Sequence, residues 1–94
     1  MTDTIAHEPE AQRYAYYQDG ELAGAAHYTQ TADALDFDST VVDPEHRGGG
    51  IASKLVKFAL DDVRDSSTKR VIASCSYVQA WLARHEDYSA LTQR

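Results

Sequence analysis

Three consecutive glycines stand between a strand-like segment and a helix-like segment, an arrangement that suits the binding of an anion. Glycine lets the backbone approach an anion closely and adopt conformations that are closed to other residues. The first N–H groups of a helix lack intrahelical partners, and the helix dipole adds about half a positive charge there. The arginine before the glycines adds a permanent cation. We therefore expect a phosphate group to bind at Arg47, Gly48, Gly49, Gly50, Ile51, Ala52 and Ser53.

Two common phosphate-binding motifs do not fit this segment. The P-loop places its lysine directly after a glycine and before Ser or Thr, whereas Lys54 lies between Ser53 and Leu55. The dinucleotide fingerprint G-x-G-x-x-G, started at Gly48, meets Ser53 where its third glycine should be. The plain alternative is that the glycines form only a flexible connection. We favour the anion site because the glycines sit tightly between a strand and a strongly amphipathic helix.

The single cysteine, Cys75, is the second residue with chemistry of its own. It ends a short apolar segment at residues 70–75 and precedes a helix-like segment at residues 77–86. A helix N-terminus favours the thiolate, which is the nucleophilic form of cysteine. The alternative is structural, because unpaired cysteines are often buried as small apolar side chains. A single cysteine also excludes an intrachain disulfide and favours a reducing compartment, so we expect a cytoplasmic protein.

Strands and a helix must position these residues. Residues 13–29 form two strand-like runs joined by Asp19-Gly20, a pair typical of a two-residue hairpin turn. Residues 34–42 alternate apolar and polar side chains, as in a half-buried strand. Residues 51–65 instead place their apolar side chains on one face of a helix. These periods predict three strands before the glycines and a helix directly after them.

The order of the elements predicts an α/β fold. Three strands in an antiparallel meander are followed by a helix, a fourth strand over residues 70–75 and a last helix over residues 77–86, in the order β-β-β-α-β-α. A helix that joins two strands of one sheet implies a right-handed crossover and a parallel pair, so the sheet is mixed. Residues 1–11 show no period and are predicted to be a flexible N-terminal arm, which leaves residues 12–94 as a single domain.

Composition and charge exclude several classes of partner. The 94 residues include 9 Lys and Arg and 15 Asp and Glu, for a formal net charge of −6, whereas proteins that follow a nucleic-acid backbone are usually basic. No apolar run approaches the ~18 residues that a membrane helix needs. His27, His46 and His85 lack metal-ligand spacing with any second ligand. We therefore expect no nucleic-acid, membrane or metal partner, and an acidic chain that attracts amines or basic peptides.

Residues 47–52, with the sequence RGGGIA, resemble the R/Q-x-x-G-x-G/A pyrophosphate loop of the GNAT superfamily of acetyltransferases. The sequence VDPEHR before the glycines resembles the V-x-P-x-x-R approach to that loop. The likeness continues through IASKLVKFAL and VIASCSYVQAWLARHEDYSAL as far as residue 91. With the upstream hairpin it covers most of residues 12–91. The chain is most similar to a short, single-domain branch of the superfamily.

This resemblance implies a GNAT-like fold and acetyl-CoA-dependent N-acetyl transfer to an amine. In the superfamily the acyl-CoA lies between two splayed parallel strands, which by position are residues 38–42 and 70–75. The backbone at residues 47–53 would hold the pyrophosphate, and an N–H near Val41 or Val42 would polarise the thioester carbonyl. The pantetheine arm would bind the backbone of Thr40, Val41 and Val42.

Cys75 is the catalytic candidate that the resemblance implies, because the short branch has a cysteine near the thioester. Cys75 would either carry the acyl group or only line the cleft. The chain departs from the branch at Ser39, where a histidine often precedes the Thr-x-Val segment. The resemblance therefore assigns no general base in this chain.

The chain also lacks the N-terminal helices that usually form the acceptor pocket in the larger superfamily. An open site suits an exposed lysine or the N-terminal amine of a protein, so the expected partners are an acyl-CoA and an amine-bearing acceptor such as a basic protein or peptide. The rival hypothesis is a non-catalytic CoA-binding or protein-interaction module that keeps the phosphate loop. Turnover of acetyl-CoA with amines and basic proteins separates the two hypotheses.

Overall fold

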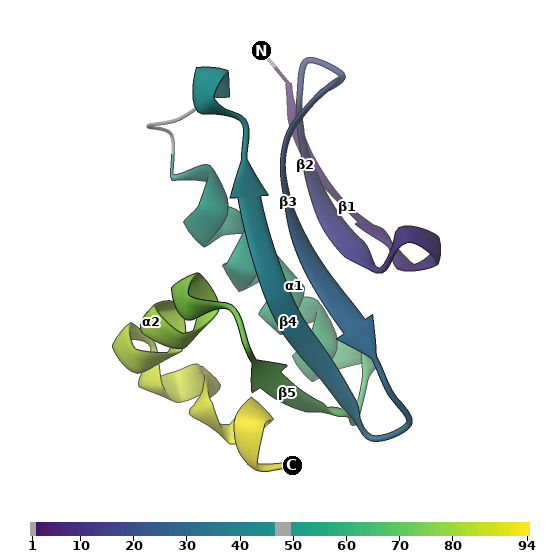
Figure 1. The fold of residues 1–94 in the computed structure, drawn as a ribbon, viewed down its shortest axis with the longest axis vertical. Coiled ribbons are helices and arrows are strands. Elements are labelled where there is room, and N and C mark those ends of the chain that lie inside the picture. Colours follow the sequence, from purple (N-terminus) through teal and green to yellow (C-terminus); the bar gives the residue numbers. More distant parts are fainter. Residues whose placement is uncertain (1, 47–49) are drawn as a thin grey trace.

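The computed structural model describes residues 2–46 and 50–94 and shows a five-stranded sheet with helices packed against it (Figure 1). The strands lie side by side in the order in which they occur along the chain. They are β1 (Asp3–Glu8), β2 (Arg13–Gln18), β3 (Glu21–Gln30), β4 (Ala34–Val42) and β5 (Arg70–Ala73). The helices are α1 (Ile51–Ser66) and α2 (Ser76–Arg84), with the 3-10 segments η1 (Pro9–Ala11), η2 (Pro44–His46) and η3 (Glu86–Gln93).

The pairing directions confirm the predicted α/β fold with a mixed sheet. Strands β1 to β4 form an antiparallel meander, and β4 and β5 form a parallel pair joined by a crossover through α1. The turn between β2 and β3 has positive φ at Asp19 (50°) and Gly20 (84°), the conformation that an Asp-Gly hairpin turn needs. The two predicted helices appear as α1 and α2, with ends within two residues of those expected.

The prediction that residues 1–11 form a flexible arm is wrong for Asp3–Glu8. These residues form β1, an additional strand at the edge of the sheet. Each residue of β1 pairs with β2, from Asp3 opposite Gln18 to Glu8 opposite Arg13. On the helix-covered side, the imidazole of His7 stacks on the ring of Tyr14 with 4.2 Å between ring centroids. The segment has no clear period of its own, and contacts made by side chains far along the chain stabilise it as a strand.

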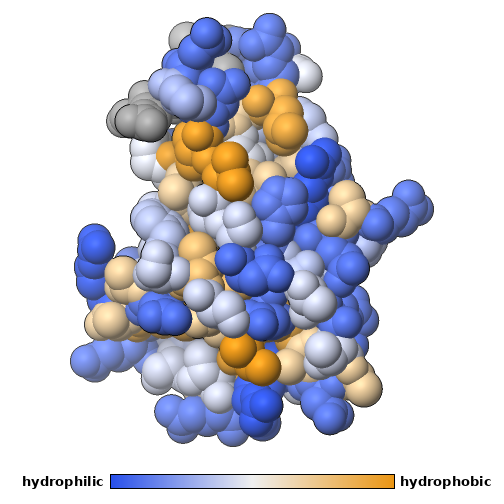
Figure 2. Space-filling view, in the orientation of Figure 1, coloured by the Kyte–Doolittle hydropathy of each residue, from blue (hydrophilic) through white to orange (hydrophobic). Residues whose placement is uncertain are grey.

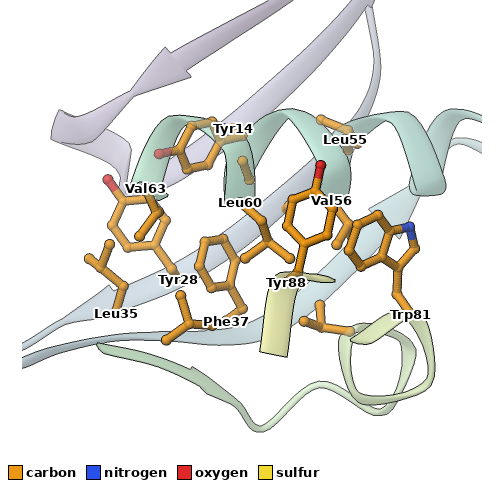
Figure 3. Close-up of a cluster of buried hydrophobic side chains, with 14 of the residues drawn as sticks. Tyr14, Tyr28, Leu35, Phe37, Leu55, Val56, Leu60, Val63, Trp81 and Tyr88 are labelled. Carbon is orange, nitrogen blue, oxygen red and sulfur yellow. The ribbon is translucent and has the colours of Figure 1, made fainter. Parts of the chain in front are cut away.

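The hydrophobic core lies between the sheet and α1, α2 and η3 (Figure 3). Phe37 of β4, Leu60 of α1 and Trp81 of α2 are all at most 4% exposed and belong to this one cluster. Burying side chains of this size contributes about 1.5–3 kcal/mol each relative to leaving them in water. The apolar face of α1 therefore fixes the helix against β3 and β4, with its N-terminus near the end of β4. No helix in the described part of the chain could cross a membrane.

The helices cover only one face of the sheet, since α1 crosses behind β3 and β4 in Figure 1. A Cβ added at Gly24 would meet Ile51 Cγ2 at 3.2 Å, so Gly24 faces α1. Side chains alternate along a strand, so Ala25 and its partner Val41 face the other way. Within residues 2–46 and 50–94, no helix lies over this second face of β2 to β4. We call it the open face; it carries Arg13, His27, Ser39 and Val41.

Candidate functional site

Strands β4 and β5 separate to form a fork. Their pairing ends where Phe37 lies opposite Ala73, and the N–H of Cys75 then donates to the carbonyl of Phe37 at 2.9 Å. Beyond this point the chain turns into α2, whereas β4 continues to Val42 beside β3. The register between β3 and β4 shifts at Asp38, which is one extra residue in β4. Such a bulge bends a strand and increases its twist, which turns β4 away from β5.

The inner edge of the fork consists of backbone groups of β4. The N–H of Asp43 donates to the carbonyl of Ala23 at 2.8 Å, so it points toward β3. Successive N–H groups along a strand point to opposite sides, and those of Val42 and Thr40 therefore point into the fork. The same alternation directs the N–H of Val41 toward β3. Of the two groups expected near the thioester carbonyl, the geometry favours Val42 over Val41.

Cys75 lies at the closed end of the fork. It is the N-cap residue of α2, and its partly exposed Sγ lies 3.6 Å from Oγ1 of Thr40. Burial raises the pKa of this thiol, but hydrogen bonds from the N–H groups of Val78, Tyr77 and Thr40 and from the Thr40 hydroxyl lower it, and the net pKa is below the ordinary value. The fork therefore ends at a partly exposed thiol whose pKa is lowered, which favours the thiolate form.

The N-terminus of α1 lies at the open end of the fork. Its N-cap, Gly50, has a left-handed conformation with φ of 68°, which favours glycine. The N–H of Lys54 makes the first helical bond, to Gly50, so the three N–H groups before it are free of the helical ladder. The side chain of Ile51 is in the core, and the hydroxyl of Ser53 accepts a bond from Trp81 Nε1 at 3.1 Å. Their backbones, rather than their side chains, are thus placed for an anion.

Of the predicted site residues, Arg47, Gly48 and Gly49 lie outside the described residues. The remaining residues lie on β4, at the start of α1 or at the N-cap of α2, and the fold brings them together from positions up to 35 residues apart, as Thr40 and Cys75 are. They are Thr40, Val41, Val42, Gly50, Ile51, Ala52, Ser53 and Cys75. Among them, Val41 directs its backbone toward β3 rather than into the fork.

A groove of about 370 Å³ runs along the open face where β4 approaches its end. The apolar side chains of Leu22, Val41 and Pro44 line it together with those of Arg13 and His27. Figure 2 shows the open face, where apolar surface gathers toward the upper end of the molecule. Residue type and spacing identified His27 only as a rejected metal ligand and did not predict this groove. Strand register, which places His27 beside β4, is the signal that would have revealed it.

The lowered pKa of Cys75 leads to a prediction about its reactivity. Alkylation by iodoacetamide, followed by mass spectrometry across a pH series, should reach its half-maximal rate at a lower pH for Cys75 than for N-acetylcysteine. Thr40→Val removes one hydroxyl donor and should move the midpoint back upward. A midpoint at or above that of N-acetylcysteine would show that burial outweighs the hydrogen bonds.

Comparisons with known proteins agree with this architecture. A family model described as GCN5-related N-acetyl-transferase matches residues 13–91. A comparison with curated protein sequences found no match.

Three solved structures resemble the fold. The ribosomal-protein-alanine N-acetyltransferase of Brucella melitensis biovar Abortus 2308 is 22% identical over 80% of this chain and 58% of its own, with a TM-score of 0.59. The N-acetylglutamate synthase of Neisseria gonorrhoeae, complexed with coenzyme A and N-acetyl-glutamate, is 21% identical over 88% of this chain and 22% of its own, with a TM-score of 0.62. A GNAT family acetyltransferase of Elizabethkingia anophelis with acetyl-CoA bound is 15% identical over 79% and 51% of the two chains, with a TM-score of 0.58. This chain thus spans at most 58% of these proteins.

Proposed function

Because the chain belongs to the family of GCN5-related N-acetyltransferases, we propose that it transfers an acetyl group from acetyl-CoA to an amine. The observation that carries this proposal is the fork between β4 and β5, which has backbone donors along one side and the Cys75 thiol at its closed end. The titles of two structural neighbours name coenzyme A or acetyl-CoA as bound molecules, which supports the choice of cosubstrate.

The described residues fit an extended acyl-pantetheine chain. The segment Thr40 to Val42 offers the edge of β4 that β5 leaves free, so the pantetheine amides would add to it as a further strand does. The backbone N–H groups at the start of α1 would hold the pyrophosphate, assisted by the glycines and Arg47. Bound in this direction, the thioester would lie toward Cys75, with the N–H of Val42 able to donate to its carbonyl oxygen.

In this proposal Cys75 is the catalytic nucleophile. Its thiolate attacks the thioester carbonyl carbon, a new C–S bond forms, and the C–S bond to CoA breaks with the CoA thiolate as leaving group. The neutral amine then attacks the acetyl-cysteine, an amide bond forms as the C–S bond to Cys75 breaks, and the departing thiolate takes up the proton that the nitrogen loses. One thioester is exchanged for another in the first step, so no external oxidant or reductant takes part. The thiol must stay reduced, which suits a cytoplasmic location.

The acceptor in this proposal is an amine on a protein or basic peptide, either a lysine side chain or an N-terminus. The open face supports this acceptor, since no helix of the described chain covers it. The net charge of −6 favours a cationic partner over an acidic one.

Ligand-dependent thermal unfolding tests the cosubstrate. A ligand present at 100 times its dissociation constant stabilises a protein by about 2.7 kcal/mol. In a domain of this size, acetyl-CoA and CoA should therefore raise the unfolding temperature by roughly 10 °C or more, and ATP should not. No shift at millimolar acetyl-CoA would contradict the proposal. Release of CoA with a panel of amines then separates the enzyme from a module that only binds CoA.

A further inference from the structure

A row of polar side chains crosses the open face at one level of four adjacent strands. Glu8 lies opposite Arg13, Arg13 opposite His27, and His27 opposite Ser39. Side chains that lie directly opposite each other in an antiparallel pair point to the same face and stand within about 5.5 Å at their Cβ atoms. His27 is thus held between Arg13 on one side and Ser39 on the other.

The neighbours of His27 are engaged elsewhere, whereas its imidazole is not. Arg13 Nε donates to Glu8 Oε1 at 2.6 Å, so the guanidinium forms an ion pair with Glu8. His7 is bonded to the hydroxyl of Tyr28 at 2.6 Å. Across residues 2–46 and 50–94, the structure shows no hydrogen bond or ion pair to the half-buried ring of His27. A ring nitrogen with a lone pair is therefore available on the open face.

The groove places this imidazole beside the part of β4 that borders the fork. His27 and Val41 both line the groove, while Thr40 contacts Cys75 from the other side of the strand. Ser39, the register partner of His27, precedes Thr40 directly in the chain. The groove and the fork therefore lie on either side of β4. Because β5 pairs with β4 only as far as Phe37, no described strand lies beside β4 beyond that residue on the fork side.

The charge of the open face suits an ammonium group. Asp36 lies opposite Thr29 on this face, and its carboxylate accepts bonds from the N–H and hydroxyl of Ser74. Asp38 accepts a bond from the hydroxyl of Thr29 at 2.7 Å. In the described part of the chain, these two carboxylates are bonded to neutral donors and form no ion pair. They would attract a cationic amine toward the level of His27.

We propose that the amine acceptor enters along the groove of the open face and that His27 is the residue that takes its proton. This inference rests on the proposed acetyl transfer. The ammonium nitrogen gives one proton to the free ring nitrogen of His27, and the resulting lone pair attacks the acetyl carbon. A C–N bond forms and the C–S bond of the acetyl-cysteine breaks. The departing Cys75 thiolate keeps the pair of electrons and takes the second nitrogen proton. The imidazolium returns its proton to water.

The test compares His27→Ala and His27→Gln with wild type. Release of CoA from acetyl-CoA is followed with n-butylamine and with a lysine-rich peptide whose N-terminus is blocked, and acetyl-CoA affinity is measured by calorimetry. General-base catalysis contributes at least about 100-fold, so kcat should fall by that factor in both variants while acetyl-CoA affinity stays within about twofold. Imidazole added to the buffer should raise the kcat of His27→Ala by about tenfold or more, because it fits the space left by the ring.

His7→Gln is the matched control, since it removes an imidazole from the same sheet on the helix-covered side. Its activity should not respond to imidazole. If His27→Ala keeps wild-type kcat, or if imidazole does not restore its activity, the assignment of His27 is overturned while acetyl transfer stands. A wild-type protein that binds acetyl-CoA but releases no CoA with either probe also overturns it. Absence of acetyl-CoA binding instead overturns the proposed function on which it rests.

Discussion

Replacing Cys75 with alanine should lower the rate of acetyl transfer by at least about 100-fold, because loss of a nucleophile removes the covalent route. The thiol lies at the closed end of the fork, where Thr40 and the first N–H groups of α2 lower its pKa. Its removal leaves the free edge of β4 and the N-terminus of α1 unchanged. Acetyl-CoA affinity, measured by calorimetry, should therefore stay close to that of wild type.

Two further measurements make this result specific. Incubation of the wild-type protein with acetyl-CoA alone should add the mass of one acetyl group to the peptide that contains Cys75, and hydroxylamine should remove it. Ser76→Ala changes the neighbouring exposed residue at the start of α2 and should have little effect on activity. Wild-type activity in Cys75→Ala would show that the thiol only lines the cleft and that the amine attacks the thioester directly.

Replacing Gly24 with valine should destabilise the protein by about 3 kcal/mol and lower its unfolding temperature by roughly 10–20 °C. A Cβ at this position would lie 3.0 Å from the carbonyl oxygen of Val41, 3.2 Å from Ile51 Cγ2 and 3.3 Å from Leu55 Cδ1. These atoms belong to the β3-facing edge of β4 and to the first turns of α1, and the backbone oxygen cannot rotate away. Relief of the clash must move β3 away from the start of α1 and from the end of β4, which disturbs the elements at the open end of the fork, so acetyl-CoA affinity should fall as well.

A graded series separates crowding from other effects of the substitution. Gly24→Ala should be less harmful than Gly24→Val, because it adds only the crowded Cβ. Glu21→Val at the exposed start of β3 introduces the same side chain without crowding and should change stability by no more than about 0.5 kcal/mol. Thermal unfolding of the three variants with and without acetyl-CoA reports both their stability and their affinity for acetyl-CoA. Wild-type stability in Gly24→Val would show that α1 tolerates displacement.

The elements that were predicted correctly depend on interactions over short stretches of chain. The apolar period of α1 repeats every three to four residues, and its buried face runs from Ile51 to Val63 as expected. The Asp19-Gly20 turn follows from positive φ at two adjacent residues. The parallel pair of β4 and β5 follows from the helix between them, because a right-handed helical crossover returns the chain to the same sheet in the same direction.

The strand β1 could not be predicted because its stability depends on a partner. Its segment reads as polar and irregular, yet His7 stacks on Tyr14, and Tyr17 donates to Glu8 at 2.6 Å. These contacts exist only after β2 has paired with β1 along its full length. Period alone is a weak signal for an edge strand with one neighbour.

The sequence by itself determined the element order, the mixed sheet, the glycine-rich connection before α1 and the candidacy of Cys75, because periodicity, turn chemistry and residue type are local properties. Only the tertiary structure decided which backbone groups point into the fork and which face carries His27. Both depend on the extra residue at Asp38 and on strand register, and a shift of one residue would turn every side chain to the other face. Register is set by contacts between strands distant along the chain, so the distance between Cys75 and Thr40 and the pairing of His27 with Ser39 emerge only when the sheet has formed.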